Sequence, residues 1–243
     1  MKTPLFLALV LLSGFSAGII HGFTNLALVE PYLDEAIGIE NQNLFETGEA
    51  MDSPSFWVEY NSYRDWQKNG QILAGGILGM SIGSLFGIVF AFSRKVLPEG
   101  HDAKKALVLA TIMWFTLFFI PFLKYPANPP TVGDSDTVVL RGILYLIFIA
   151  ISGLSALGFY HISKQFKKRK KILSIIGYAI FMSLVFIFMP SNPDVMTAPI
   201  SLVDGFRLMS LLAVSVFWIS NALILGILWN RFKPDSSIHT KIL

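Results

Sequence analysis

Six long apolar stretches run through the chain of 243 residues, and no other feature constrains its fold as strongly. Each holds close to the ~20 apolar residues with which a helix crosses a hydrocarbon core of ~30 Å. They cover about 4–29, 70–96, 104–123, 138–161, 172–189 and 206–229. The pattern predicts an all-α, polytopic membrane protein with six transmembrane helices, in which residues 1–243 form a single integral membrane domain.

The basic residues change sides at every crossing, and this alternation predicts the orientation. If the N-terminus lies inside, the cytoplasmic segments hold 14 of the 19 Lys and Arg residues. Lys and Arg close to span ends set the topology of membrane proteins. The acids have the opposite distribution, with 13 of 16 on the outer side. We therefore expect a multi-pass protein of the cell membrane with both termini cytoplasmic, whose spans pair as three helical hairpins that turn on the outer side.

Composition excludes several classes of function. The chain has no cysteine, so disulfides, thiolate metal ligands and cysteine nucleophiles are ruled out. The net charge of +3 comes from the cytoplasmic loops, and it suits the anionic lipid of the bilayer rather than nucleic acid. The motifs G-x-x-x-x-G-K-[ST] and H-E-x-x-H do not occur. We therefore expect no enzyme, no nucleic-acid partner and no permanently bound cofactor.

Two turns of the sequence Pro-x-Asn-Pro, at 126–129 and 190–193, are predicted to end the third and fifth spans. Proline lacks the amide donor that a helix interior needs, and it biases the preceding residue away from the helix. An acid and an arginine then mark the entry of the returning helix in each case: Asp136 with Arg141, and Asp204 with Arg207. We expect each arginine to pair with its acid, with anion binding as the alternative.

Glycines recur every four residues in the first two spans, at Gly14, Gly18 and Gly22 and again at Gly75, Gly79, Gly83 and Gly87. Such spacing forms one stripe on a helix, where missing side chains let another backbone approach closely. Close helix packing is the favoured interpretation, and a gating hinge is the alternative.

His21 lies in the outer half of the first span, with Asn25 one turn later on the same face. An ionisable group inside a membrane is costly and usually faces the bundle or a wet cavity. His21 is therefore a candidate metal ligand or proton carrier on a transport path. The alternative is a neutral histidine that forms a hydrogen bond with a neighbouring helix.

The segment 30–69 is predicted to be a long, acidic outer loop. Glu30 and Asp34 lie one turn apart if the helix resumes beyond Pro31, and together with His21 they are the candidate ligands of a divalent cation. On a straight helix Glu30 lies opposite His21, so convergence needs a bend near Pro31 or ligands from another span. A solvated acidic loop without bound metal is the alternative.

Short segments near the span ends carry a more specific signal than the spans themselves. They are Val29-Glu30-Pro31-Tyr32, Phe86-Gly87-Ile88-Val89-Phe90-Ala91, Phe119-Ile120-Pro121, Tyr125-Pro126-Ala127-Asn128-Pro129-Pro130, Met189-Pro190-Ser191-Asn192-Pro193 and Phe206-Arg207-Leu208-Met209-Ser210. Arg141 opens the fourth predicted span, and Trp218 lies in the last. In order and spacing, these segments resemble the CbtA family of predicted cobalt transporter subunits over almost the whole chain.

The resemblance implies cobalt uptake linked to cobalamin synthesis, often beside CbtB, a small, single-span, histidine-bearing subunit. Cobalt(II) would then be the transported ion, with nickel as an alternative, and the partner would be a CbtB-like subunit or a second copy of the chain. Many relatives are histidine-rich in the first outer loop, whereas residues 39–68 contain no histidine, so carboxylates or another subunit would have to collect the ion. The alternative function is a non-transporting structural subunit of a larger membrane complex, consistent with the glycine stripes and the few polar residues within the spans.

Overall fold

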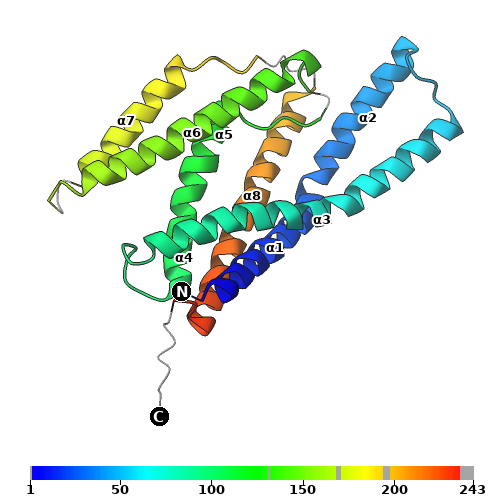
Figure 1. The fold of residues 1–243 in the computed structure, drawn as a ribbon. Helices are drawn as coiled ribbons and strands as arrows, with labels where there is room; N and C mark the ends of the chain where they lie inside the picture. The colour runs from blue at the N-terminus through cyan, green and yellow to red at the C-terminus, as the bar shows by residue number, and fades with distance from the viewer. Residues whose placement is uncertain (1, 131, 168–170, 194–197, 236–243) are drawn as a thin grey trace. The chain divides into compact units, whose positions relative to one another are not determined.

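The computed structural model describes residues 2–130, 132–167, 171–193 and 198–235 (Figure 1). Apart from turns and connections, these residues form helices only. The α-helices are α1 (Thr3–Leu28), α2 (Glu30–Thr47), α3 (Pro54–Ser93), α4 (Asp102–Trp114), α5 (Ile120–Lys124), α6 (Val138–Ser163), α7 (Ile172–Phe188) and α8 (Ile200–Phe232). A π-helical turn, η1 (Phe115–Phe119), joins α4 to α5, and a short 3-10 turn, η2 (Ser135–Thr137), precedes α6.

Five helical segments among the described residues are long and apolar enough to cross a membrane: α1, α3, α4 through α5, α6 and α8. The all-helical, multi-pass architecture expected from the apolar stretches is therefore confirmed. The helix of the fifth stretch, α7, has 17 residues, and a helix of that length spans only ~26 Å, against ~30 Å for the hydrocarbon core. The sixth span and the arrangement in three hairpins stay predictions.

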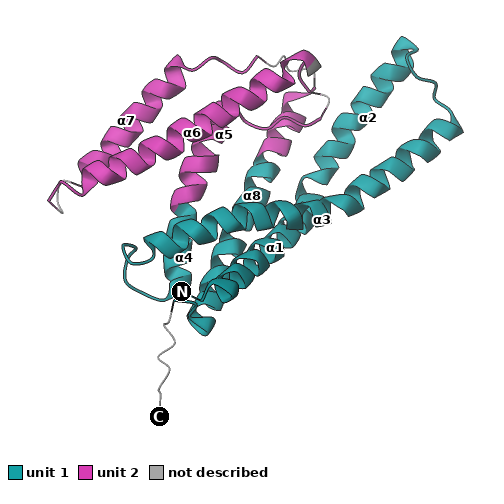
Figure 2. Ribbon diagram, viewed as in Figure 1, with its two compact units in different colours: residues 1–111, 208–243 teal, residues 112–207 magenta. Residues whose placement is uncertain are grey.

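The chain divides into two compact units, residues 1–111 with 208–243 and residues 112–207 (Figure 2). In the first unit, α1 and α3 cross at their glycine stripes. A Cβ atom added to Gly75 would lie 2.7 Å from the carbonyl oxygen of Gly18, and one added to Gly22 would lie 2.8 Å from Cα of Ile72. No side chain fits between backbones this close, so the stripes serve helix packing, as expected.

The segment 30–69, predicted to be a loop, is helical over most of its length. Pro31 starts α2 rather than breaking a helix, because proline is tolerated in the first turn. Gly48 ends α2 in the left-handed conformation with φ 75°, and Ser53 caps α3 by accepting a hydrogen bond from Phe56 N at 3.3 Å. The 40 residues of α3 span ~60 Å, so this helix extends well beyond a hydrocarbon core of ~30 Å.

In the second unit, Pro121 accounts for the π-helical turn η1. The backbone oxygen of Thr116 lacks a donor from its own helix. Ile120, four residues later, donates its amide to Phe115 O instead, and Pro121, five residues later, has no amide hydrogen. The Ser152 hydroxyl on α6 supplies this donor at 2.5 Å. Because that hydroxyl has only one hydrogen, the Tyr178 hydroxyl on α7 donates to Ser152 Oγ, at 2.8 Å. A chain of two hydrogen bonds thus links the apolar helical segments η1, α6 and α7.

The two Pro-x-Asn-Pro turns lie together in this unit. The Tyr125 hydroxyl, just before the first turn, donates to Pro190 O in the second turn at 2.7 Å. Arg207 forms an ion pair with Asp204 at 3.6 Å, as expected, and also donates to Asn128 Oδ1 in the first turn at 2.7 Å. The equivalent Arg141 donates to the backbone oxygen of Asp134 at 3.4 Å, a long hydrogen bond.

Candidate functional site

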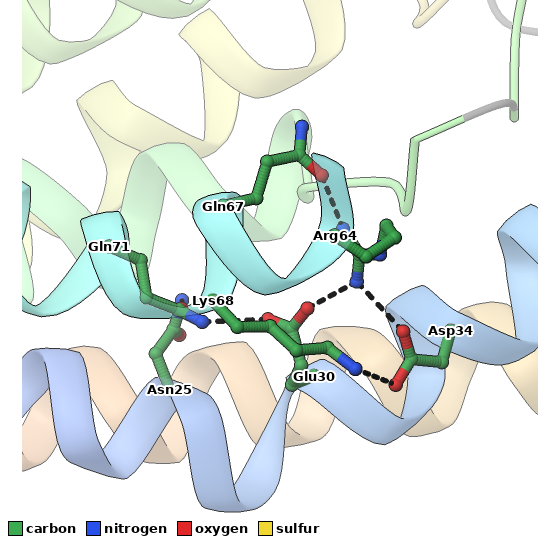
Figure 3. Close-up of polar contacts among 7 residues, drawn as sticks. All are labelled: Asn25, Glu30, Asp34, Arg64, Gln67, Lys68 and Gln71. Carbon is green, nitrogen blue, oxygen red and sulfur yellow. Dashed lines mark hydrogen bonds and ion pairs between the residues drawn. The ribbon is translucent and has the colours of Figure 1, made fainter. Parts of the chain in front are cut away.

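Two rows of polar side chains meet where the first residues of α2 lie beside α3 (Figure 3). Glu30 and Asp34 lie one turn apart on α2, as predicted for a helix that resumes at Pro31. Arg64, Lys68 and Gln71 follow each other at spacings of four and three on α3, which places them on one face. We call these five residues the carboxylate cluster.

Arg64 lies at the centre of the carboxylate cluster, between the two acids (Figure 3). Its Nη2 atom donates to Glu30 Oε1 and, at 2.8 Å, to Asp34 Oδ1. Lys68 Nζ lies 2.7 Å from Asp34 Oδ2, and Gln71 Nε2 donates to Glu30 Oε2 at 2.9 Å. Every oxygen of the two carboxylates thus has a donor on α3.

Burial differs sharply within the carboxylate cluster. The side chains of Glu30 and Arg64 are 6% and 9% exposed, whereas those of Asp34 and Lys68 are 43% and 31% exposed. Burial alone would raise the pKa of the Asp34 carboxyl, but the hydrogen bonds and charges of Lys68 and Arg64 outweigh it and hold the pKa below its usual range. The cluster therefore has a buried end at Glu30 and an end open to solvent at Asp34.

His21, the third predicted ligand, faces a different helix. Its Nδ1 lies 3.0 Å from the carbonyl oxygen of Ala213 on α8, and its ring packs edge-on against Phe217. Because a carbonyl only accepts, Nδ1 carries the hydrogen of this bond, and in a neutral ring Nε2 then keeps its lone pair. Glu30 instead faces α3. His21 therefore does not join the two carboxylates in this structure.

Among the described residues, no group of three or more His, Asp or Glu side chains is arranged to hold a metal ion. The carboxylate cluster offers two acids, and Gln67, three residues after Arg64 on α3, adds an amide oxygen that accepts from Arg64 Nη1 at 2.7 Å. Carboxylate and amide oxygens suit hard or borderline divalent cations. Metal ligation by His21, Glu30 and Asp34 stays a prediction.

Sequence reasoning missed the basic half of the carboxylate cluster. Arg64 and Lys68 are the only basic residues between residues 30 and 69, and they lie four apart, as do Glu30 and Asp34. Once that segment is understood as two helices, opposite charges with matching spacing predict pairing between them. The signal was present, but it depended on recognising α2 and the early start of α3.

A second charged group, also not foreseen, lies at the other end of α3. Arg94 donates from Nε and Nη2 to the two carboxylate oxygens of Asp102, at 2.5 and 3.0 Å, and from Nη1 to Asp235. Its guanidinium also lies 5.8 Å from the centre of the Trp229 ring. These contacts connect the end of α3, the start of α4 and the end of α8. The group makes a structural connection between helix ends.

The glycine stripes include two matches to the serine-hydrolase pattern G-x-S-x-G, at 14–18 and 79–83. In such enzymes this pattern forms a strained turn between a strand and a helix. Here both matches lie inside long helices, α1 and α3, and their glycines form the helix crossing. Neither match therefore has the geometry of a nucleophile elbow.

Comparisons with known proteins place the chain in a family. Residues 4–230 match the family described as "Probable cobalt transporter subunit (CbtA)". No curated protein and no solved structure matches the chain. The match covers nearly all of the chain, including every predicted span and the carboxylate cluster. The chain therefore belongs to the CbtA family of probable cobalt transporter subunits.

Proposed function

We propose that this protein takes up a divalent transition-metal ion, cobalt(II) first, through the membrane for cobalamin synthesis. Membership of the CbtA family supports cobalt as the transported ion. The observation that carries the mechanism is the convergence of Glu30 and Asp34 on one point, the Nη2 atom of Arg64. Both carboxylates thus place an oxygen within hydrogen-bond distance of one nitrogen, at a position that a shared cation could take.

In this proposal the carboxylates receive the ion and His21 takes it further. Asp34, at the solvent end of the cluster, makes the first contact, and the buried Glu30 shares the ion. His21 lies nine residues before Glu30, ~13 Å along a helix. Its Nε2 lone pair supplies the nitrogen ligand that cobalt and nickel accept readily. Binding strength favours nickel over cobalt at most sites, so selection of cobalt has to come from geometry.

The word subunit in the family description implies a partner. A small, single-span, histidine-bearing subunit of the CbtB kind fits this role, because residues 39–68 contain no histidine that would collect the ion. A second copy of the chain is the other candidate. The exposed apolar side chains of the helices are accounted for by the lipid bilayer.

Cobalt uptake into liposomes by the purified protein tests the proposal against the alternative of a non-transporting structural subunit. We expect cobalt to enter protein-containing liposomes faster than protein-free ones. Absence of uptake by the protein alone, together with its stable purification inside a larger assembly, would favour the structural subunit.

His21→Ala tests the second step of the path. We expect this variant to impair cobalt accumulation in cells more than His101→Ala at equal membrane abundance, because His101 lies exposed at the predicted cytoplasmic side. If both variants accumulate cobalt like the parent, His21 is a packing residue held by Ala213 and Phe217.

A further inference from the structure

The guanidinium of Arg64 lies where a cation held by both carboxylates would lie. Its Nη2 atom donates to Glu30 and, at 2.8 Å, to Asp34 (Figure 3). In zinc sites the distance from metal to carboxylate oxygen is ~2.1 Å. The oxygens would therefore only have to close in by a fraction of an ångström around a metal that replaced the nitrogen.

The charges of the carboxylate cluster are balanced without a metal. Glu30 and Asp34 contribute two negative charges, and Arg64 and Lys68 contribute two positive ones. A divalent cation brings the same positive charge as the two basic side chains together. Placing it beside them would bring like charges together in a partly buried site, which is unfavourable. The metal and the basic residues therefore compete for the same oxygens.

The bonding of Arg64 is incomplete, unlike that of Arg94, the paired arginine just after the end of α3. All three guanidinium nitrogens of Arg94 donate to Asp102 or Asp235. Nε of Arg64 is buried and makes no hydrogen bond within the part of the chain that the structure describes. Its Nη1 binds Gln67 on its own helix at 2.7 Å. One nitrogen of the Arg64 guanidinium thus makes no hydrogen bond, and another bonds only within its own helix. Such a guanidinium is easier to displace from the carboxylates than one whose nitrogens all bind them.

We propose that Arg64 and Lys68 are exchangeable counterions, which hold Glu30 and Asp34 until a divalent transition-metal ion displaces them. This inference rests on the proposed function, because it concerns the same carboxylates. After displacement Arg64 keeps its bond to Gln67, and Lys68, whose side chain is 31% exposed, turns to water. Because these ion pairs join α2 to α3, metal binding also loosens one helix from the other.

Calorimetric titration of cobalt(II) into the purified protein in lipid nanodiscs tests the exchange. Arg64→Gln and Lys68→Gln each remove one competing charge and keep a polar side chain. Because the metal then has one basic side chain fewer to displace, we expect the dissociation constant for cobalt to fall about tenfold or more in each variant. Arg94→Gln is the matched control, the same change at the other end of α3, and we expect it to leave the dissociation constant unchanged.

The outcomes separate this inference from the proposed function. If Glu30→Gln weakens cobalt binding but neither Arg64→Gln nor Lys68→Gln strengthens it, the carboxylates bind the metal and the basic residues only brace them. That result overturns the exchange and leaves the proposed function standing. If Glu30→Gln and Asp34→Asn both bind cobalt like the parent, the proposed site itself is wrong. Because Lys68 is partly exposed, Lys68→Gln decides the matter even if Arg64→Gln fails to fold.

Discussion

The carboxylate of Asp34 holds α2 against α3 by charge, so its contribution to stability depends on pH. Its pKa is lower in the folded protein than its ordinary value, because Lys68 and Arg64 outweigh the effect of burial. Such a carboxyl stabilises the folded state above its unfolded pKa of ~4, and the contribution disappears as the pH falls through the lower, folded value. The ion pairs of Asp34 therefore stabilise the folded protein less in acid than at neutral pH.

We expect the difference in thermal stability between the parent and Asp34→Asn to be constant near neutral pH and to shrink below about pH 4. Thermal unfolding of the purified proteins in detergent, measured over a series of pH values, gives this difference. If it were as large at pH ~3 as at neutral pH, Asp34 would contribute through packing and not through charge.

The sequence predicted the acidic half of the carboxylate cluster, because the spacing of Glu30 and Asp34 needs only a helix. It did not predict the basic half, because Arg64 and Lys68 come from a second helix that was thought to be a loop. The angular difficulty between His21 and Glu30 was foreseen. In the structure the two residues do not converge: His21 contacts Ala213 on α8, and Glu30 contacts Arg64 on α3.

At the scale of elements, the crossing of α1 and α3 leaves no room for a side chain. A Cβ on Gly75 would lie 2.7 Å from the backbone oxygen of Gly18, and a backbone atom cannot rotate away. We expect Gly75→Ala to lower the free energy of unfolding by about 1–3 kcal/mol, measured by denaturation in mixed micelles. The packing interpretation of the stripes depends on this result.

Gly158→Ala on α6 is the control, because no atom lies within 4 Å of the place that its Cβ would occupy. Alanine has the higher helix propensity, so we expect this variant to be neutral or more stable by up to ~1 kcal/mol. Equal effects at Gly75 and Gly158 would show that the crossing tolerates side chains and that the stripe has another purpose.

The helix α2 shows why some elements escaped prediction. The spans were evident because a long apolar run needs no partner to be recognised. The α2 sequence is mixed and polar, and Pro31 was thought to close the first helix rather than to start a second. The boundary signals were nevertheless present, with Gly48 as the stop of α2 and Ser53-Pro54 as the start of α3.

For the whole molecule, the charge alternation makes a topology prediction that the absence of cysteine renders easy to test. Glu46 on α2 lies on the predicted outer side, and Lys95 after α3 lies on the predicted cytoplasmic side; both are exposed. In intact cells we expect a membrane-impermeant maleimide to label Glu46→Cys and to reach Lys95→Cys only after permeabilisation. Labelling of Lys95→Cys in intact cells would overturn the orientation.

The central claim is that Glu30 and Asp34 bind the cation on its way in, beyond the general attraction of an acidic surface. The double variant Glu30→Gln/Asp34→Asn removes two negative charges, and so does Glu46→Gln/Glu59→Gln, at exposed positions of the same segment. General attraction therefore changes to a similar extent in both, and only the first pair loses the shared oxygens.

The initial rate of cobalt uptake into liposomes, at equal protein content, is the most direct measurement. We predict that Glu30→Gln/Asp34→Asn lowers this rate about tenfold or more, as expected for the loss of metal-binding groups, whereas Glu46→Gln/Glu59→Gln changes it by no more than about twofold. Equal rates for the two double variants would contradict the account, because the carboxylates would then act only through their charge.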